Sequence, residues 1–567
     1  MNLEVFLLRV LLLSLAGLLT LCPLLAQTAP PAFPVCDVRA YGARGDGATL
    51  DSAAVTAAIA ACAKQGGGTV YFGPGRYVIG TVQLQSHIRL FLESGAALVG
   101  SHNINDYLAS PPFGFARNYG VDITGEGALL GMLIAKNAED VSIEGQGEID
   151  GQGDTFMSLQ TIHGGGDYME QYVRNPEKFH AAMATVEYGP VEPNHRPGTM
   201  IVFFHCSNVR LRGITLRQSP NWTLHLQDVE GAAISDIQIL NDPRVPNNDG
   251  IDCMMCRHVR ISNTNIDTGD DGLAIVRSEH INVTNTSISS RSAAIRLEST
   301  KLSTFTALSM DTNRGIAIFA DSFTGQEERS TEDVTFSDIV IRTRLFPGSW
   351  WGKAEPIYIA VQSCAPGVAC GVRVRNVVFN NITAEAENGS LLWGGEGSPI
   401  SGVEFNGLRM HMIAPAPSLS ESVGGNLDLR WTVVTPRYGI VKSDIPAFYA
   451  KQVAGLRLQN VQVDWANSMP DYFSDGIKIE DFTDLTIDSF AGRQAQAATG
   501  AAVYLQNGSG VSITNSRATA GTNTFLQLDK VADRRVFVNY DLSGAQNSLV
   551  PSDYPFNTQI GVVPHAP

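Results

Sequence analysis

The stretch HVRISNTNI, residues 258–266, decides the fold, because HINVTNTSI, residues 280–288, repeats its pattern 22 residues later. Apolar and polar residues alternate in both copies, which predicts β-strands. Within each copy, a small or amide residue marks a bend between two short strands. Adjacent copies begin 22 to 27 residues apart where the chain is regular. Further copies begin at Asp140, Asn208, Gly231, Asp333, Asn376, Gly402, Gly455 and Gly510.

A fixed period of this length predicts a solenoid, and repeats made only of strands and bends predict an all-β parallel β-helix. Stacked coils would share a core of Ile, Val, Leu and Phe, and Asn or Thr at matching bends would form ladders. A β-sandwich is the alternative. Its turns would recur every ~8–12 residues with hairpin dipeptides, whereas the returns in this chain are longer and alike.

The clearest helix is predicted over residues 51–65, DSAAVTAAIAACAKQ, with Asp51 or Ser52 as its N-cap and glycines after its end. We expect this helix to cover the first coil of the solenoid, since terminal repeats must hide their apolar face. Cys36 and Cys62 flank this region and are a plausible disulfide in an oxidising compartment. Cys364 and Cys370 form a second plausible pair.

Residues 1–29 predict a secretory signal peptide, apolar around Arg9, broken at Pro23 and ending on small residues. An uncleaved anchor is the alternative, because the apolar stretch approaches the length of a membrane span. No other long apolar run occurs, so we expect a secreted protein, extracellular or periplasmic, without stable membrane association after signal cleavage. Residues 30–567 are then predicted to form a single β-helix catalytic domain, a monomer, with an insertion at about 155–198.

The composition limits the partners. The chain has 567 residues, of which 17% are charged, and a formal net charge of −16. Such a charge argues against nucleic-acid binding, which needs a basic face. An acidic substrate would have to be met by a local cluster of Arg or Lys.

Three aspartates in two motifs form the candidate catalytic group. Asp249 lies in NNDGID (247–252), and Asp270 and Asp271 lie in TGDDG 21 residues further on, about one coil. Neighbouring strands are ~4.8 Å apart, so the three carboxyls should be close and at least one pKa should be raised. A protonated carboxyl beside ionised ones suits hydrolysis of a glycosidic bond. Stacked Asp turns or a Ca²⁺ site are the alternatives.

The two motifs resemble the Asn-Thr-Asp and Gly-Asp-Asp signatures of glycoside hydrolase family 28, the polygalacturonase-like pectin hydrolases. Similar stretches include ALLGMLIAKNAEDVSIEGQGEIDGQG (128–153) and RPGTMIVFFHCSNVRLRGITLRQSPNWTLHLQ (196–227), and the resemblance covers roughly residues 36 to 320. It implies a right-handed parallel β-helix, inversion of configuration, no cofactor and no metal. The implied substrate is a pectic polysaccharide or oligosaccharide, cleaved outside the cytoplasm.

The resemblance also implies roles for the aspartates. Asp271 would be the general acid, while Asp249 and Asp270 would hold and activate the attacking water. Asn247 stands where the family motif has Asn and would orient Asp249 or touch a sugar. Inverting enzymes separate their acid and base by ~6.5–9.5 Å, which predicts that spacing for Asp271 against the other two.

The sequence departs from the family on the next two coils. The family's Gly-His-Gly is replaced by SSRSAAIRLES (289–299), and its Arg-Ile-Lys by a segment with Ala317 and Phe319. Arginine can hold a planar carboxylate by a bidentate contact, so nearby arginines could substitute in part. These departures predict a divergent specificity, for a rhamnose-containing or substituted pectin. The proposed substrate-binding cations are Arg277, Arg296 and Arg314.

A second candidate binding segment is PGSWWGKAEPIYI, residues 347–359. Trp351 could stack on a sugar ring with Lys353 at its edge, or the loop could simply be packed on the solenoid. His225 is interpreted as a packed strand residue, and His163 or His195 could replace the missing family histidine.

Two other functions remain open from the sequence. A polysaccharide lyase on the same fold would use Ca²⁺ and a basic residue, and a non-catalytic glycan-binding β-helix would use the aspartates as turns.

Overall fold

The structure is a computed structural model that describes residues 34–107, 131–162, 175, 177–178, 189–320, 330–348, 350, 352–361, 372–395, 397–428, 440–442 and 444–550. The predicted signal peptide, His163, Trp351, Cys364 and Cys370 lie outside these residues. None of the described helices is long and apolar enough to cross a membrane.

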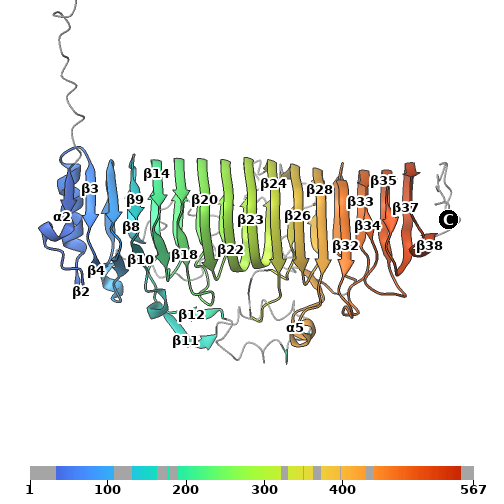
Figure 1. Cartoon of the computed structure of the whole chain (residues 1–567), viewed down its shortest axis with the longest axis horizontal. Coiled ribbons are helices and arrows are strands. Elements are labelled where there is room, and N and C mark those ends of the chain that lie inside the picture. Colours follow the sequence, from blue (N-terminus) through green and yellow to red (C-terminus); the bar gives the residue numbers. More distant parts are fainter. Residues whose placement is uncertain are drawn as a thin grey trace, which may run out of the picture.

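The described strands stack as successive coils of a parallel β-helix, which confirms the predicted fold class (Figure 1). The coils up to the candidate site consist of short strands. Their bounds are β1 Val35–Asp37, β2 Asp46–Leu50, β3 Gly68–Phe72, β4 Gly75–Ile79, β5 Val82–Leu84, β6 Ile88–Leu92, β7 Ala96–Gly100, β8 Gly131–Lys136, β9 Ser142–Gly145, β10 Glu148–Asp150, β13 Thr199–Phe204, β14 Ser207–Arg212, β15 Thr215–Arg217, β16 Leu224–Gln227, β17 Glu230–Ser235, β18 Gln238–Leu240 and β19 Ile251–Met254.

In the later coils, several strands run through two or three sides of one coil. Their bounds are β20 Arg257–Thr268, β21 Leu273–Val276, β22 Glu279–Glu298, β23 Lys301–Ala320, β24 Ser330–Thr343, β25 Ile357–Val361, β26 Arg373–Ala386, β27 Ser390–Trp393, β28 Ile400–Met412, β31 Phe448–Ala454, β32 Arg457–Trp465, β33 Ile477–Asp488, β34 Ala491–Gly492, β35 Ala501–Thr514, β36 Arg517–Ala518, β37 Thr522–Val538 and β38 Ala545–Val550.

The repeat encodes both the core and the bends. Inward residues of successive coils stack on one another, as in the phenylalanine column of Phe305 and Phe336, whose ring centroids lie 5.0 Å apart. At one bend, Asp236, Asn263 and Asn285 all have positive φ, between 47° and 57°, which short polar side chains tolerate best. Asn285 Nδ2 donates to Asn263 Oδ1 at 2.8 Å, so the expected amide ladder is present.

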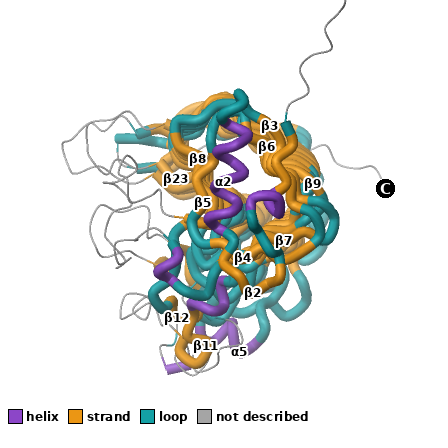
Figure 2. The backbone as a smooth tube through the Cα atoms, turned by 90° about the vertical axis from the view of Figure 1, so that its left-hand side faces the viewer, coloured by secondary structure: helices purple, strands orange, loops and turns teal. Residues whose placement is uncertain are grey.

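Helix α2, Ser52–Ala63, lies across the N-terminal end of the coils (Figures 1 and 2) and buries Val55 and Ile59 against the first coil. Asp51 occupies the N-cap position, but its carboxylate accepts from the backbone N–H groups of Arg44 and Gly45 instead of from the helix. The predicted disulfide between Cys36 and Cys62 is present.

The coil stack carries additional elements on one side, where Figure 1 shows β11, β12 and α5 together. Strands β11 (Met157–Ile162) and β12 (Val191–Pro193) form a separate antiparallel pair within the predicted insertion. Helix α5 spans Pro417–Ser422, and β29 (Asn426–Asp428) pairs with β30 (Ile440–Lys442).

One row of residues runs from coil to coil along the outer face of the strands, because its members alternate with residues that face the core. Each member pairs in parallel register with the next, one coil further along. We call it the outer row, and its members are His225, Asp252, Ala274, Arg296, Ala317, Tyr358, Leu391, Tyr449, Lys478 and Tyr504.

Candidate active site

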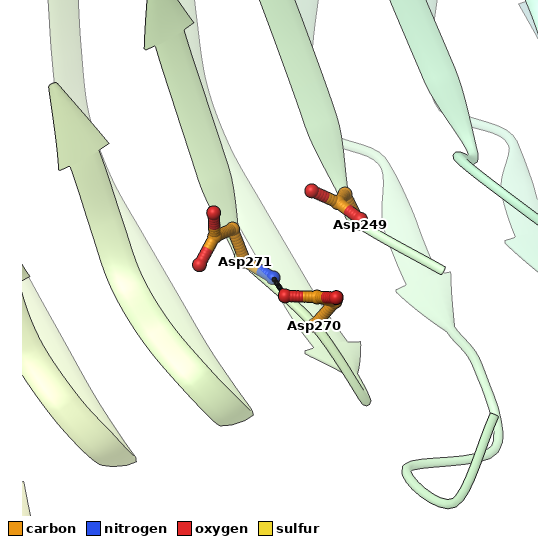
Figure 3. A group of neighbouring side chains, drawn as sticks. All are labelled: Asp249, Asp270 and Asp271. Atoms are coloured by element: carbon orange, nitrogen blue, oxygen red, sulfur yellow. Dashed lines mark hydrogen bonds between the residues drawn. The ribbon is translucent and has the colours of Figure 1, made fainter. Parts of the chain in front are cut away.

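The three predicted aspartates meet at two stacked turns. Asp249 precedes β19 and Asp271 precedes β21, and the backbone N–H of Gly250 donates to the carbonyl of Asp271 at 2.9 Å. One carboxylate oxygen each from Asp249, Asp270 and Asp271 lies within 4.8 Å of the others. Figure 3 shows the three side chains grouped at the ends of neighbouring strands. The sequence offset of one coil therefore predicted the proximity of the three residues, which are all buried. Their oxygens come closer than the predicted ~6.5–9.5 Å, because the two turns stack directly on each other.

The turn that carries Asp270 is held by side chains of both motifs. Asn248 Oδ1 accepts from the backbone N–H of Gly269 at 2.7 Å, and Thr268 Oγ1 accepts from that of Asp270 at 2.9 Å. Asn247 donates to Asp270 Oδ2 from its backbone N–H at 3.2 Å and from Nδ2 at 3.3 Å. Adjacent aspartates can thus face one site, which a regular strand would forbid.

Asp271 has the surroundings of a carboxylate anion. Its Oδ2 accepts a hydrogen bond from Arg296 Nε at 2.5 Å. Its Oδ1 accepts from Ser292 Oγ at 3.0 Å and from the backbone N–H of Ala293 at 3.2 Å. Arginine and backbone donors favour the ionised form of a carboxyl group. The cation comes from the coil on which the family histidine is missing.

The other two carboxyls favour protons. Burial raises the pKa of Asp270 to about 7, with the charge of Asp271 as the second cause. Burial also raises the pKa of Asp249 well above its usual range, followed by repulsion from Asp270. Within the described residues, Asp249 Oδ1 has no hydrogen-bond partner. The cluster thus combines two carboxyls of raised pKa with a third, Asp271, that is paired with Arg296.

Asp252 is a fourth carboxyl of the cluster, and the sequence did not single it out. Burial raises its pKa well above the usual range, opposed by the charge of Arg296. Neither of its oxygens has a hydrogen-bond partner in the described part of the chain, and the residue is fully buried. The alternation of β19 gives the signal, because Ile251 and Cys253 face the core and leave Asp252 on the outer face.

Arg196 is a second residue that the sequence did not single out. Its guanidinium donates to the carbonyl oxygens of Pro220 and Pro246 at 2.8 and 2.7 Å. It also donates to Asn247 Oδ1 at 3.0 Å, and so fixes the amide that contacts Asp270. Its position directly before Pro197, at the end of the predicted insertion, gave no specific signal.

The remaining sequence candidates lie in different surroundings. Arg314 is 2% exposed, donates to both carboxylate oxygens of Glu355, and has its guanidinium 3.9 Å from the Tyr358 ring centroid. Lys353 is 3% exposed in the same segment. Arg277 is partly exposed beyond β21. The structure therefore joins Arg296 to the aspartates and buries Arg314 beside Glu355.

The two described histidine candidates differ in burial. His225 is 1% exposed, as a packed strand residue should be, and its Nε2 lies 3.2 Å from Gln227 Oε1. Burial lowers its pKa to about 4, so the ring is neutral at physiological pH. His195 is exposed.

Buried carboxyls in unlike surroundings, close together on one face of a β-helix, are typical of the catalytic site of a glycoside hydrolase. The model described as "Glycosyl hydrolases family 28" matches residues 121–421. The chain belongs to glycoside hydrolase family 28, the polygalacturonase-like glycosidases, as its motifs predicted.

Individual relatives are distant. A probable polygalacturonase of Vitis vinifera is 25% identical over 412 residues, 66% of this chain and 74% of that protein. An exo-poly-alpha-D-galacturonosidase of Dickeya chrysanthemi is 27% identical over 254 residues, 42% of this chain and 41% of that protein. The solved family 28 exopolygalacturonase of Yersinia enterocolitica superposes with a TM-score of 0.54 at 15% identity, over 81% of this chain and 79% of that one. This last likeness shows the shared fold.

Proposed function

We propose that the protein hydrolyses a glycosidic bond of a pectic polysaccharide or oligosaccharide, with inversion of configuration. The observation that carries the proposal is the buried cluster of Asp249, Asp270 and Asp271 with Arg296 at one end. Membership of a family whose relatives bear polygalacturonase names supports the substrate class.

The contacts favour a division of roles that differs from the one implied by the resemblance. Asp271 was expected to be the acid, but its three donors, including Arg296, favour its anion. Asp270 has its pKa raised to about 7 and is the better proton donor near neutral pH. Asp271 would then activate the water as the base, and the open oxygen of Asp249 would help to hold it.

This assignment has a direct pH consequence. A general acid must be protonated, so turnover by Asp270 falls as the pH rises through about 7. The charge of Asp271 helps to raise the pKa of Asp270, and Asp271→Asn removes it. Any residual activity of this variant should therefore begin to fall at a lower pH than that of the wild type. If Asp271 were the acid, Asp271→Asn would instead leave only pH-independent background hydrolysis.

We propose Arg296 as the main contact for a uronate carboxylate next to the scissile bond. Its Nε is engaged by Asp271 and its Nη1 by Glu298, and its side chain is 13% exposed. Arg277, Arg314 and Lys353, with Asn247 and Trp351, complete the proposed binding set. Arg314 and Lys353 are buried around Glu355, to which the Arg314 guanidinium and the Lys353 backbone N–H donate, so their contribution to binding would be indirect.

We also propose that the protein acts as a secreted monomer without a cofactor. The Cys36–Cys62 disulfide supports an oxidising compartment.

The test is product release from galacturonan, rhamnogalacturonan and branched pectin fragments, followed by proton NMR of the fresh anomeric centre. An inverted first product supports the proposal. Retention would overturn inversion, and the close approach of the carboxylate oxygens, within 4.8 Å, makes this the decisive measurement. Release of an unsaturated product would show a lyase instead, and no release from any fragment would leave a binding protein.

A further inference from the structure

A second polar cluster lies on the same face as the aspartates, six coils further along. From Ala274, the outer row passes through Arg296, Ala317, Tyr358, Leu391 and Tyr449 to Lys478, which is six steps. At ~4.8 Å per step, the distance is about 29 Å. We call this group the distal cluster, and its members are Trp393, Tyr449, Lys451, Lys478, Glu480, Asp481 and Tyr504.

Aromatic rings and two lysines alternate in the distal cluster. Lys478 Nζ lies 5.6 Å from the Tyr449 ring centroid and 5.5 Å from that of Tyr504. Lys451 Nζ lies 5.3 Å from the Trp393 ring centroid. Trp393 and Tyr449 meet edge to face at 6.0 Å. These rings fix the ammonium groups, since each cation is attracted to the ring faces.

Carboxylates share the same ammonium groups. Lys451 Nζ lies 3.0 Å from Glu480 and 3.3 Å from Asp481, while Lys478 Nζ lies 3.2 Å from Glu480 and 2.9 Å from Asp444. Burial opposes ionisation of Glu480, but the hydrogen bond from Lys451 and the charge of Lys478 outweigh it and lower its pKa. Against the effect of burial, the same ion pairs hold the pKa values of Lys451 and Lys478 above their usual range and the pKa of Asp444 below it, so these groups are charged at neutral pH.

The charges decide which ligand suits the cluster. Two lysines give +2 and Glu480, Asp481 and Asp444 give −3, so the sum is −1. A uronate would bring a fourth carboxylate to the three that already share these two lysines. A neutral sugar offers hydroxyl groups that accept from ammonium and donate to carboxylate, and an apolar ring face that packs on an indole.

The cluster also remains reachable. The side chains of Lys451 and Lys478 are 26% and 13% exposed, and those of Glu480 and Asp481 are 12% and 36% exposed. Trp393 and Tyr504 are partly exposed as well. In contrast, Tyr358 and Leu391, which lie between this cluster and Arg296 on the outer row, are fully buried.

We infer that the distal cluster is a subsite for a neutral sugar unit of a branched pectic substrate, about 29 Å along the outer row from the aspartates. The inference rests on the proposed function for the substrate class alone. Arg296 would hold a uronate of the backbone, and Trp393, Lys451 and Glu480 would hold a neutral sugar. The enzyme would thereby prefer substituted pectin over plain galacturonan.

The experiment is titration calorimetry of the full chain with two probes, a neutral galactan tetrasaccharide and an unbranched trigalacturonate. The wild type should bind both. Lys451→Gln and Trp393→Ala should each weaken galactan binding by about tenfold or more and leave trigalacturonate binding unchanged. Lys301→Gln is the matched control, because Lys301 makes a similar pair with Glu332 at 3.1 Å outside the outer row.

Two results would overturn the inference: no galactan binding by the wild type, or equal weakening of both probes by the distal variants. Because Trp393→Ala could loosen the coil, the partly exposed Lys451→Gln and a thermal melt keep the outcome interpretable. Galactan binding that persists while no pectic fragment is cleaved would sink the proposed hydrolysis and retain the distal site. Cleavage of galacturonan without galactan binding would do the reverse.

Discussion

The turns at residues 269–275 (GDDGLAI) and 473–479 (FSDGIKI) occupy the same place in the coil, yet they carry different chemistry. Asp271 and Asp475 each stand three residues before an outer-row residue, Ala274 or Lys478. Beside Asp271, the preceding coil supplies Asp249 and the following coil supplies Arg296.

Beside Asp475, the preceding coil offers Pro446 at the corresponding place, and the backbone N–H of Ala501 donates to the carboxylate at 2.6 Å. Asp475 is 4% exposed, so it shapes the turn beneath the distal cluster. The comparison teaches that register fixes where a side chain lies, while the neighbouring coils decide whether it performs chemistry.

The largest expected effect is a difference in kcat between aspartate variants of the first turn and of the second turn. Asp270→Asn or Asp271→Asn should lower kcat by about 10²–10⁴-fold, because each removes a group that transfers a proton or activates water. Asp475→Asn should keep kcat on unbranched galacturonan within about twofold, since Asp475 lies six coils from the aspartate cluster and its carboxylate is taken up by the backbone N–H of Ala501. Initial rates of reducing-sugar release measure both.

A comparable loss in Asp475→Asn, with an unchanged thermal melt, would break the comparison. It would place a second hydrolytic centre at the distal turn.

The next effect concerns the cation beside each aspartate. Arg296→Gln should lower kcat/KM on galacturonan by about 10²-fold, because it leaves the buried Asp271 anion without its partner. Arg296→Lys should restore part of this loss, since it returns the charge without the fork geometry. Lys478→Gln, five coils away from Arg296, should leave kcat/KM on the unbranched substrate unaffected.

The measurement is a rate series over substrate concentration at two salt concentrations. An Arg296→Gln enzyme with wild-type kcat/KM would remove Arg296 from the proposed site.

A third, smaller effect is shared by both turns and concerns stability. Burial raises the pKa of Asp270 and that of Asp475 to about 7, with repulsion by Asp271 adding to the first. The folded state then holds a proton that the unfolded state has released, so stability falls as the pH rises from about 4 to about 7 and is flat above. Asp270→Asn and Asp475→Asn should each remove part of this slope.

At pH 8 either variant should be more stable than the wild type, by on the order of 2–4 kcal/mol as an upper range. Urea unfolding at pH 5 and pH 8 tests this. A variant that is less stable than the wild type at pH 8 would show that the carboxylate is better satisfied than its contacts indicate.

The fold could be predicted from the sequence because the length of the repeat gives the length of one coil, and the alternation of apolar and polar residues gives its strands. The repeat also placed Asp249 beside Asp271, since one coil of offset means neighbouring strands. The contact of Arg296 with Asp271 could not be predicted from the sequence, because strand register does not determine the conformation of a long side chain. The burial of Arg314 against Glu355, 41 residues away, depends on an insertion whose path no periodic pattern describes.

The smallest expected effect concerns a metal. Three carboxylate oxygens within 4.8 Å could surround a divalent cation, whereas the distal turn has lysines in place of such a group. Arg296 already supplies a positive charge at Asp271, and the raised pKa values of Asp249 and Asp270 mean that a cation would have to displace protons. Product release should therefore change by less than about twofold in EDTA at pH 6. If EDTA abolished activity and added Ca²⁺ restored it, the aspartate cluster would be a metal site. The two turns would then differ in metal binding, with lysines at the distal turn in place of the metal.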